Sequence, residues 1–301
     1  MTIDLQIGGY AIRLRERAGR PCLHWPLKPF DEFLNRPERT PDIDLDVRIV
    51  DELPAVPHGP LVFDASHGFW KLYGTESGCV LESPDTQTLE PRSRAIISED
   101  FSRGTVWHLA ERGSAGTAWT PMHVITPIVE VCLVTRLARE SGLMLHASGV
   151  VTEQDGWAFT GPSGAGKSTL ADLFAQTGAS VLSDERIIIR NVAGLLMVYG
   201  TPWPGSGRQA ANASAHLTRL YCLKHGNGAH VLRALSPRDF SLFLLRQCFL
   251  PHWDRTAMDQ TLGFLNELIA RLGCRELAFA KKPDVVGYLR RQHSEHQAAA
   301  L

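Results

Sequence analysis

A glycine-rich segment contains the residues of this chain whose types and spacing point most clearly to chemistry. It reads Gly161-Pro162-Ser163-Gly164-Ala165-Gly166-Lys167-Ser168-Thr169 and fits the pattern G-x-x-x-x-G-K-[ST] at every position. Glycines let the backbone bring its N–H groups close to an anion, and a lysine adds a mobile positive charge. A serine hydroxyl at this position is a ligand for Mg²⁺. The segment therefore predicts an ATP site, with these residues around the phosphates and Ser168 on the metal.

Two neighbouring acids, Asp184 and Glu185, follow this segment after one expected helix and one expected strand. A short helix followed at once by a strand returns the chain to the edge of the sheet where the loop lies, close to bound phosphates. One carboxylate can hold Mg²⁺ while the other takes a proton from an attacking hydroxyl. We predict that both are catalytic residues and metal ligands. Ordinary surface acids at the end of a strand are the alternative.

A histidine, His146, precedes the loop in an apolar strand predicted over 144–151. From there it can orient the catalytic acid or stabilise charge on the transferred phosphoryl group. We therefore group it with the acid pair and Lys167 as catalytic. A histidine packed in the core is the alternative interpretation.

A Pro/Gly-rich segment ending in an arginine, 200–208, follows a predicted strand. It could form a mobile cover over the nucleotide or the acceptor. The planar guanidinium of Arg208 can bind a phosphate or an acceptor carboxylate through paired hydrogen bonds, which makes Arg208 the candidate substrate-binding residue. The alternative is a structural turn with a packed tryptophan. The other histidines, among them His123, have no metal-ligand spacing on one expected helix, and we assign them to surface or packing roles.

The elements around these residues alternate between strands and helices in the second half of the chain. Apolar periodicity and turn residues predict helices over 127–141 and 168–176, and strands over 144–151, 157–160, 180–183, 186–190, 195–199 and 276–280. A hairpin is predicted from 217–223 and 229–235, and later helices begin at Pro237, near Thr256 and at Pro283. The first half contains short strands broken by turns, such as the alternating segment 43–49.

This pattern predicts a mixed α/β chain (α+β) with two domains and a tail. A β-rich N-terminal domain covers 1–126, and a P-loop catalytic domain covers 127–290. A frayed tail covers 291–301, which is polar and Ala-rich. Because the first domain contains no recognisable chemistry, we assign acceptor recognition to it.

Taken together, the histidine-bearing strand, the loop Gly161–Ser168 and the acid pair after one helix resemble the catalytic domain of HPr kinase/phosphorylase. They look most similar to the HPr-kinase-related serine kinases, a group also related to phosphoenolpyruvate carboxykinase. The resemblance covers roughly Leu143 to Arg290. It implies that the loop binds ATP, that Ser168 helps to hold Mg²⁺, and that Asp184 and Glu185 are the metal and base pair with His146 as their partner.

Two departures accompany this resemblance. The second acid is Glu185, where the kinase/phosphorylase has an aspartate, and the longer side chain leaves the division of roles between the acids open. The N-terminal half does not resemble the regulatory domain of the bacterial enzyme, and the signature of its reverse phosphorolysis is not recognisable here.

Composition excludes several other classes of protein. The 301 residues carry a formal net charge of -1, which argues against a general nucleic-acid binder. No apolar run is long enough to span a membrane. An acid near the N-terminus, Asp4, and dispersed cysteines lead us to expect a cytoplasmic protein without a signal peptide. A homo-oligomer is compatible with the sequence.

Three functions remain open at this point. The first is an ATP-dependent kinase that phosphorylates a hydroxyl, in particular serine, on a peptide or small protein; analogy with the family adds a ribosomal natural-product precursor as an acceptor. The second is a kinase of a small hydroxyl metabolite such as free serine, with Arg208 on the carboxylate. The third is a regulatory module that binds ATP without transferring phosphate.

Overall fold

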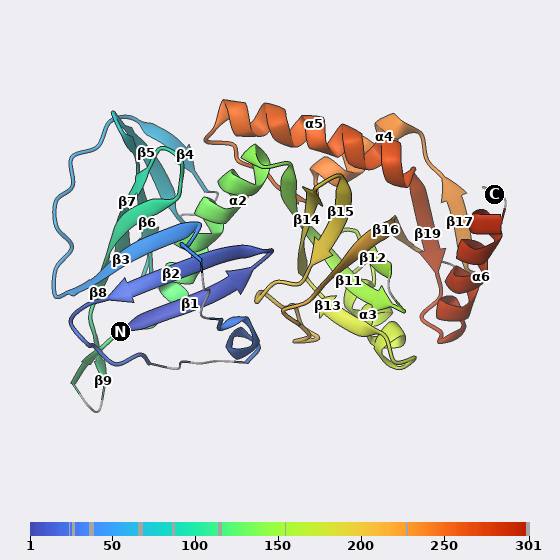
Figure 1. The fold of residues 1–301 in the computed structure, drawn as a ribbon, viewed down its shortest axis with the longest axis horizontal. Coiled ribbons are helices and arrows are strands. Elements are labelled where there is room, and N and C mark those ends of the chain that lie inside the picture. The colour runs from blue at the N-terminus through green and yellow to red at the C-terminus, as the bar shows by residue number, and fades with distance from the viewer. Residues whose placement is uncertain are drawn as a thin grey trace. The chain divides into compact units, whose positions relative to one another are not determined.

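The computed structural model describes residues 1–23, 25, 28–35, 39–65, 69–85, 88–113, 116–153, 155–226 and 228–298 (Figure 1). The chain divides into two compact units. The first contains Met1–Glu140 and Pro251–Gln260, and the second contains Ser141–Leu250 and Thr261–Leu301.

In the part of the first unit that the structure describes, the main element is an eight-stranded sheet with the order β1-β2-β3-β8-β7-β6-β5-β4. Its strands are β1 (Thr2–Ile7), β2 (Tyr10–Glu16), β3 (Ile43–Val50), β4 (Leu61–Asp64), β5 (Lys71–Thr75), β6 (Gly78–Pro84), β7 (Pro91–Ser98) and β8 (Arg103–Leu109). The other elements are a ribbon of β9 (Glu111–Gly113) and β10 (Gly116–Ala118), and the helical segments η1 (Phe30–Phe33), α1 (Met122–Val124), η2 (Ile125–Val129) and α2 (Glu130–Arg139).

Alternation in β3 explains how one face of this sheet is buried. Ile43 and Leu45 are fully buried, whereas Asp44 points to the other face and accepts a 2.9 Å hydrogen bond from Arg15 on β2. The alternating segment predicted over 43–49 is therefore a half-buried strand, as expected from the two-residue period of strand side chains.

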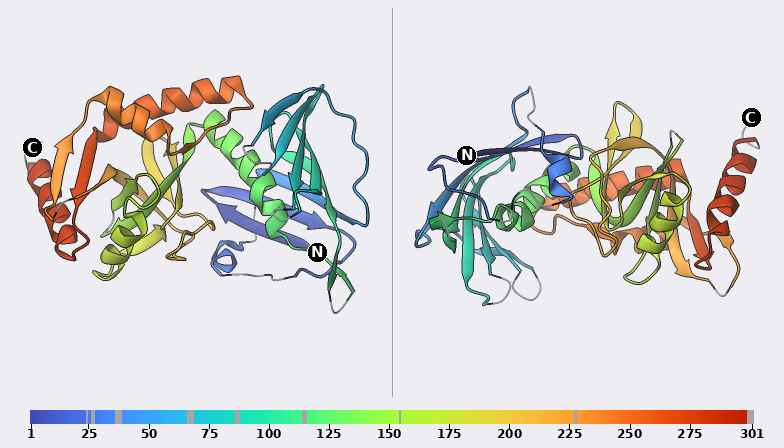
Figure 2. Two further views of the ribbon diagram at one scale, coloured as in Figure 1. Left: turned by 180° about the vertical axis from the view of Figure 1, so that it is seen from behind. Right: turned by 90° about the horizontal axis from the view of Figure 1, so that it is seen from below.

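The helix α2, predicted as part of the catalytic domain, belongs to the first unit, so that the division falls after Glu140 and not at 126. Figure 2 shows α2 lying against the sheet of that unit. The Tyr10 hydroxyl donates to Glu140 at 2.9 Å, and Arg139 donates to the carbonyl oxygen of Glu99 at 2.9 Å. These bonds join the end of α2 to β2 and to the turn after β7, which are long-range contacts that periodicity does not reveal.

The second unit has a nine-stranded sheet among its described residues, with the order β12-β11-β14-β15-β16-β19-β17 and with β13 and β18 paired to β11. An additional pairing of β12 with β16 links strands far apart in that order. The strands are β11 (Gly142–Thr152), β12 (Asp155–Thr160), β13 (Ser180–Ser183), β14 (Arg186–Val192), β15 (Leu195–Tyr199), β16 (Ser214–His225), β17 (Val231–Ala234), β18 (Cys248–Phe249) and β19 (Arg275–Phe279).

Helices cover this sheet on two faces, because alternate strand residues belong to two separate apolar cores. On β12, Ala158 packs with residues of α4 (Pro237–Leu245) and α5 (Arg255–Leu272). Its neighbour Phe159 packs with residues of α3 (Lys167–Ala175) and α6 (Asp284–Ala298). Both faces of the strands are therefore buried, which explains their nearly continuous apolar sequences.

Two sequence expectations for this unit are wrong. The hairpin of 217–223 with 229–235 does not form, because β19 lies between β16 and β17, parallel to the first and antiparallel to the second. The tail predicted to fray from 291 continues as α6 to Ala298, and the ring of His293 packs 5.3 Å from that of Trp157. Residues 299–301 lie outside the described residues. None of the described helices is both long and apolar enough to cross a membrane.

Candidate functional site

The glycine-rich loop connects β12 to α3, as the sequence predicts. Gly164 and Gly166 adopt φ angles of 79° and 102°, which residues with a side chain rarely adopt. A Cβ atom on Gly166 would also lie 2.8 Å from the ring of Phe279. The helix bonds of α3 begin directly after the loop, where Leu170 N–H donates to Gly166 at 2.9 Å. The first amides of α3 are therefore available to an anion at the loop.

Lys167 is the first residue of α3, and its side chain bends back over the loop. Its Nζ donates to the carbonyl oxygens of Gly161 at 2.8 Å and Pro162 at 3.3 Å, and the residue is only 5% exposed. Pro162, Ser163 and Gly164 are exposed, whereas Ser168 and Thr169 are half-buried. The ammonium group is thus held at the loop by two carbonyl oxygens, which a bound phosphate can replace.

Asp184 comes directly after β13 and is fully buried. Its Oδ1 accepts a 2.8 Å hydrogen bond from Gly205 N–H, and its Oδ2 accepts one of 2.8 Å from Gly207 N–H. Both carboxylate oxygens are therefore engaged with the segment 200–208. We conclude that this carboxylate anchors that segment.

Glu185, in contrast, is partly open to solvent and pairs with the predicted histidine. Its Oε1 lies 3.1 Å from Nδ1 of His146, with exposed side-chain fractions of 32% and 25% respectively. The backbones are also joined, because Ala147 N–H donates to the Glu185 carbonyl at 2.9 Å. The structure thus brings His146 and the second acid together, and gives the two acids different surroundings.

The charges of these groups influence one another. Burial lowers the pKa of the Lys167 ammonium, whereas the carboxylates of Glu185 and Asp184 oppose that effect. Burial also lowers the pKa of His146, and the positive charge of Lys167 lowers it further. Glu185 acts in the opposite direction on His146. The ammonium, the imidazole and both carboxylates therefore form one electrostatic cluster, in which His146 is neutral at pH 7.

Three pairings hold the elements of this cluster together. β11 pairs with β12, β13 and β14, so the histidine strand is bonded to the strands that flank the loop and the acids. Ser148 on β11 is fully buried, and its hydroxyl donates to the Lys167 carbonyl at 3.2 Å. Ser148 is not part of any recognisable motif, and its position two residues after His146 is its only sequence signal.

The segment 200–208 is held in place by several contacts. Besides the bonds to Asp184, the Thr201 hydroxyl donates to the Arg186 carbonyl at 2.6 Å, and Trp203 is buried. A Cβ atom on Gly205 would lie 2.9 Å from Oε2 of Glu185, so this backbone lies directly against both acids. Arg208 is exposed, with a left-handed φ of 54°. Its role in substrate binding stays a prediction.

This arrangement combines an anion-binding loop, a lysine ammonium group held at that loop, and a solvent-accessible carboxylate beside a neutral imidazole. These are the components of phosphoryl transfer from a phosphoanhydride to a hydroxyl whose proton a general base takes. The hydroxyl of Ser168 and the carboxylates are oxygen donors of the kind that Mg²⁺ prefers. The donor set therefore fits a nucleotide with its magnesium ion.

Comparison with known proteins yields little beyond this geometry. No family model and no curated protein matches the sequence. Among solved structures, the HPr(Ser) kinase/phosphatase from Coxiella burnetii superposes with a TM-score of 0.31 and 14% sequence identity, covering 52% of this chain and 98% of that chain. A superposition at this level transfers no residue roles, so the roles proposed below depend on the geometry of this chain.

Proposed function

We propose that this protein is an ATP- and Mg²⁺-dependent kinase that transfers the γ-phosphoryl group to a hydroxyl, in particular serine, on a peptide or small protein. The observation that carries the proposal is the pairing of Glu185 with His146 at 3.1 Å, in one electrostatic cluster with Lys167 of the glycine-rich loop. A base beside a phosphate loop is needed for transfer to a hydroxyl, whereas simple nucleotide binding does not require one.

Binding of the nucleotide falls to the loop and the start of α3. Lys167 exchanges its bonds to Gly161 and Pro162 for bonds to phosphate oxygens, and the amides of the loop and of the first turn of α3 face the same anion. Ser168 and a carboxylate of the acid pair, Asp184 and Glu185, would hold the magnesium ion. When bound, this ion neutralises charge on the phosphates.

The surroundings of the two acids suggest how they divide the work. Glu185 takes the proton of the acceptor hydroxyl while the hydroxyl oxygen attacks the γ-phosphorus. The bond between the γ-phosphorus and the oxygen of the β-phosphate breaks, and ADP leaves. His146 keeps the Glu185 carboxylate in position. Asp184 fixes the segment 200–208 through Gly205 and Gly207, so that this backbone borders the reacting groups.

Two classes of acceptor molecule are candidates for the phosphoryl group. A peptide or small protein, such as a ribosomal natural-product precursor, is our first choice, with the N-terminal unit as its recognition element. The exposed side chain of Arg208 favours a second candidate, a small metabolite such as free serine whose carboxylate this guanidinium would bind.

One experiment separates these functions. The full chain is incubated with γ-labelled ATP and Mg²⁺, and separately with peptides, small proteins of its own cell extract and free amino acids. Label on a peptide or protein serine supports the proposal, and label on a free amino acid supports the second candidate. Tight ATP binding without label on any acceptor would contradict both and indicate a regulatory ATP-binding module.

A further inference from the structure

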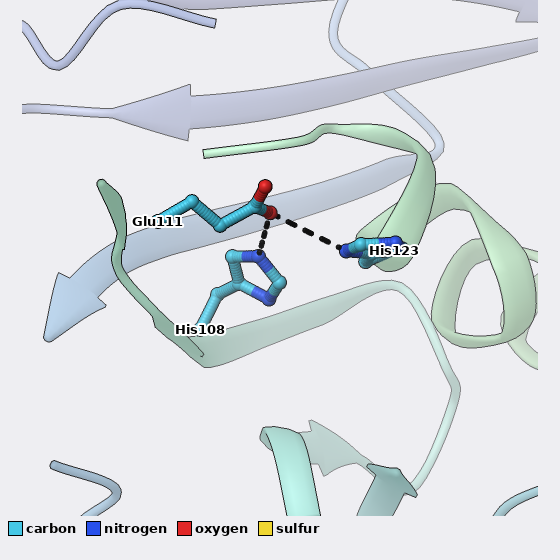
Figure 3. A group of neighbouring side chains, drawn as sticks. All are labelled: His108, Glu111 and His123. Carbon is cyan, nitrogen blue, oxygen red and sulfur yellow. Dashed lines mark ion pairs between the residues drawn. The ribbon is translucent and has the colours of Figure 1, made fainter. Parts of the chain in front are cut away.

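A second cluster of ionisable side chains lies in the first unit, apart from the residues discussed so far. His108 is on β8, Glu111 begins β9, and His123 is on α1. Figure 3 shows both rings directed at one oxygen of the glutamate. Oε1 of Glu111 lies 3.7 Å from Nε2 of His108 and 3.6 Å from Nδ1 of His123.

His108 is the most buried member of the cluster, with no exposed surface. Its Nδ1 lies 2.7 Å from the hydroxyl of Ser93, which is also fully buried. Its Nε2 has no hydrogen-bond partner among the described residues. The Ser93 contact fits either tautomer of the ring, and in the tautomer that donates from Nδ1 to Ser93 the Nε2 lone pair faces Glu111 and can bind a metal ion.

Nδ1 of His123 accepts a 3.0 Å hydrogen bond from Nε of Arg92, so this atom carries a lone pair that an ion can take only in place of Arg92. The His123 side chain is 44% exposed, so one side of the cluster is open to solvent. The other carboxylate oxygen of Glu111 accepts from the Thr120 hydroxyl at 3.2 Å, which orients the carboxylate.

These three ligand atoms lie within 4.8 Å of one another. In a tetrahedral zinc site with bonds of roughly 2.0–2.1 Å, ligand atoms are about 3.4 Å apart, so the two contacts to Glu111 are already close to that spacing. Two imidazoles and one carboxylate suit Zn²⁺ and similar transition metals, whereas Mg²⁺ and Ca²⁺ prefer oxygen ligands. A hydrogen bond from the remote nitrogen typically supports a metal-bound histidine, and the Ser93 hydroxyl, 2.7 Å from Nδ1 of His108, can accept one.

We propose that His108, Glu111 and His123 form a Zn²⁺ site in the first unit, with a fourth position open to water on the exposed side of His123. The ion would join β8, β9 and α1. The sequence favours a surface or packing role for His123, because the three ligands come from three elements and have no common spacing.

The guanidinium of Arg92 competes with the ion for Glu111 and His123. Its guanidinium lies 2.8 Å from Oε1 of Glu111 and also bonds His123, so it places a positive charge where the ligand atoms converge. Its third contact is with Asp85 at 2.9 Å. Binding of the ion therefore requires Arg92 to leave Glu111 and His123.

The test uses the full chain, stripped of metal and without nucleotide, with Mg²⁺ in excess to occupy oxygen-rich sites. Co²⁺ is titrated in as an optical substitute for Zn²⁺, and Zn²⁺ is then added to displace it. We expect one equivalent of Co²⁺ to produce the visible absorption of a tetrahedral nitrogen and oxygen site, and Zn²⁺ to abolish it. No uptake by the wild-type chain, or absorption typical of thiolate ligands, would overturn the proposal.

Variants locate the ion. We expect His108→Ala, Glu111→Gln and His123→Ala to weaken Co²⁺ and Zn²⁺ binding at least about tenfold, and Ser93→Ala to weaken it about tenfold. Arg92→Ala should strengthen binding, because it removes the competing charge. His58→Ala, which changes an exposed histidine of the same unit, should bind as wild type. Thermal unfolding with a chelator present identifies any variant that is not folded. Unchanged affinity in folded His108→Ala and His123→Ala would overturn the assignment.

Discussion

Nδ1 of His146 on β11 lies 3.1 Å from Oε1 of Glu185, which is in the turn between β13 and β14 and follows the glycine-rich loop and α3 in the chain. The neighbouring Asp184 is fully buried and directs both oxygens at backbone N–H groups of the segment 200–208. Adjacent acids of the same charge thus have different partners and different access to solvent. This difference is the basis for giving them different roles.

Replacing Lys167 with alanine should reduce phosphoryl transfer by at least about 10²-fold, because the loop loses the cation that faces the phosphates. Nucleotide affinity should fall as well. Transfer of label from γ-labelled ATP and calorimetric titration with ATP measure the two effects. Lys224→Ala, at an exposed lysine of the same unit, is the matched control and should behave as wild type. Transfer by Lys167→Ala at the wild-type rate would show that the lysine of the loop takes no part in the reaction.

Asp184→Asn should mainly affect the structure of the segment 200–208. The amide keeps one acceptor oxygen, so one hydrogen bond to Gly205 or Gly207 is lost in a buried place, at a cost of about 2 kcal/mol in the free energy of unfolding. We expect a lower midpoint in urea, weaker protection of the Gly205 and Gly207 amides from hydrogen exchange, and a reduced transfer rate. An unchanged exchange rate at these amides would contradict the anchoring role.

Gly207→Ala tests the same contact from the other side. A Cβ atom there would lie 2.7 Å from Oδ2 of Asp184, so the segment must move away from the carboxylate. We expect a loss of about 1–3 kcal/mol in the free energy of unfolding, together with slower transfer. Gly263→Ala is the control, because nothing lies within 4 Å of its added Cβ and it is inside α5, where alanine is favoured. Equal effects of the two substitutions would show that steric contact with Asp184 is irrelevant.

The pH dependence of transfer should reflect His146. Because burial lowers its pKa below the ordinary value of 6.5, the ring stays neutral at pH 7 and becomes charged only at more acidic pH. An imidazolium would bind the Glu185 carboxylate as an ion pair and weaken it as a base. The rate should therefore be constant near pH 7 and fall at a pH below 6.5.

The matching variant is His146→Gln, which keeps a polar side chain but does not titrate. We expect roughly a tenfold slower rate at pH 7 and the loss of the acidic limb that His146 causes. His216→Gln, at an exposed histidine of β16, serves as the control. An identical pH profile in His146→Gln and wild type would return His146 to a packing role.

Local patterns predict much of the second unit. The strand expected over 180–183 forms over the same residues, and the loop lies between a strand and a helix as its motif requires. The helix predicted from Ser236 and Pro237 begins there, with the Ser236 hydroxyl accepting from Asp239 N–H at 3.1 Å. These features depend on neighbours in sequence, so periodicity and capping residues are sufficient to identify them.

Long-range pairings account for what the sequence could not reveal. The insertion of β19 between β16 and β17 joins strands separated by two helices, and no local turn signal indicates it. The partners of Asp184 are backbone N–H groups, and their trace in the sequence is limited to the glycines at 205 and 207, which do not identify the carboxylate that they contact. The cluster around Glu111 likewise depends on the meeting of three elements.

The measurement that tests the central claim most directly compares Glu185→Gln with wild type, using the acceptor that the wild-type chain labels. Glutamine has nearly the same shape as glutamate but cannot take the proton of the hydroxyl. We predict ATP affinity within about threefold of wild type and a single-turnover transfer rate at least about 10²-fold slower. Transfer by Glu185→Gln at the wild-type rate, with ATP bound equally well, would contradict the assignment of Glu185 as the catalytic base.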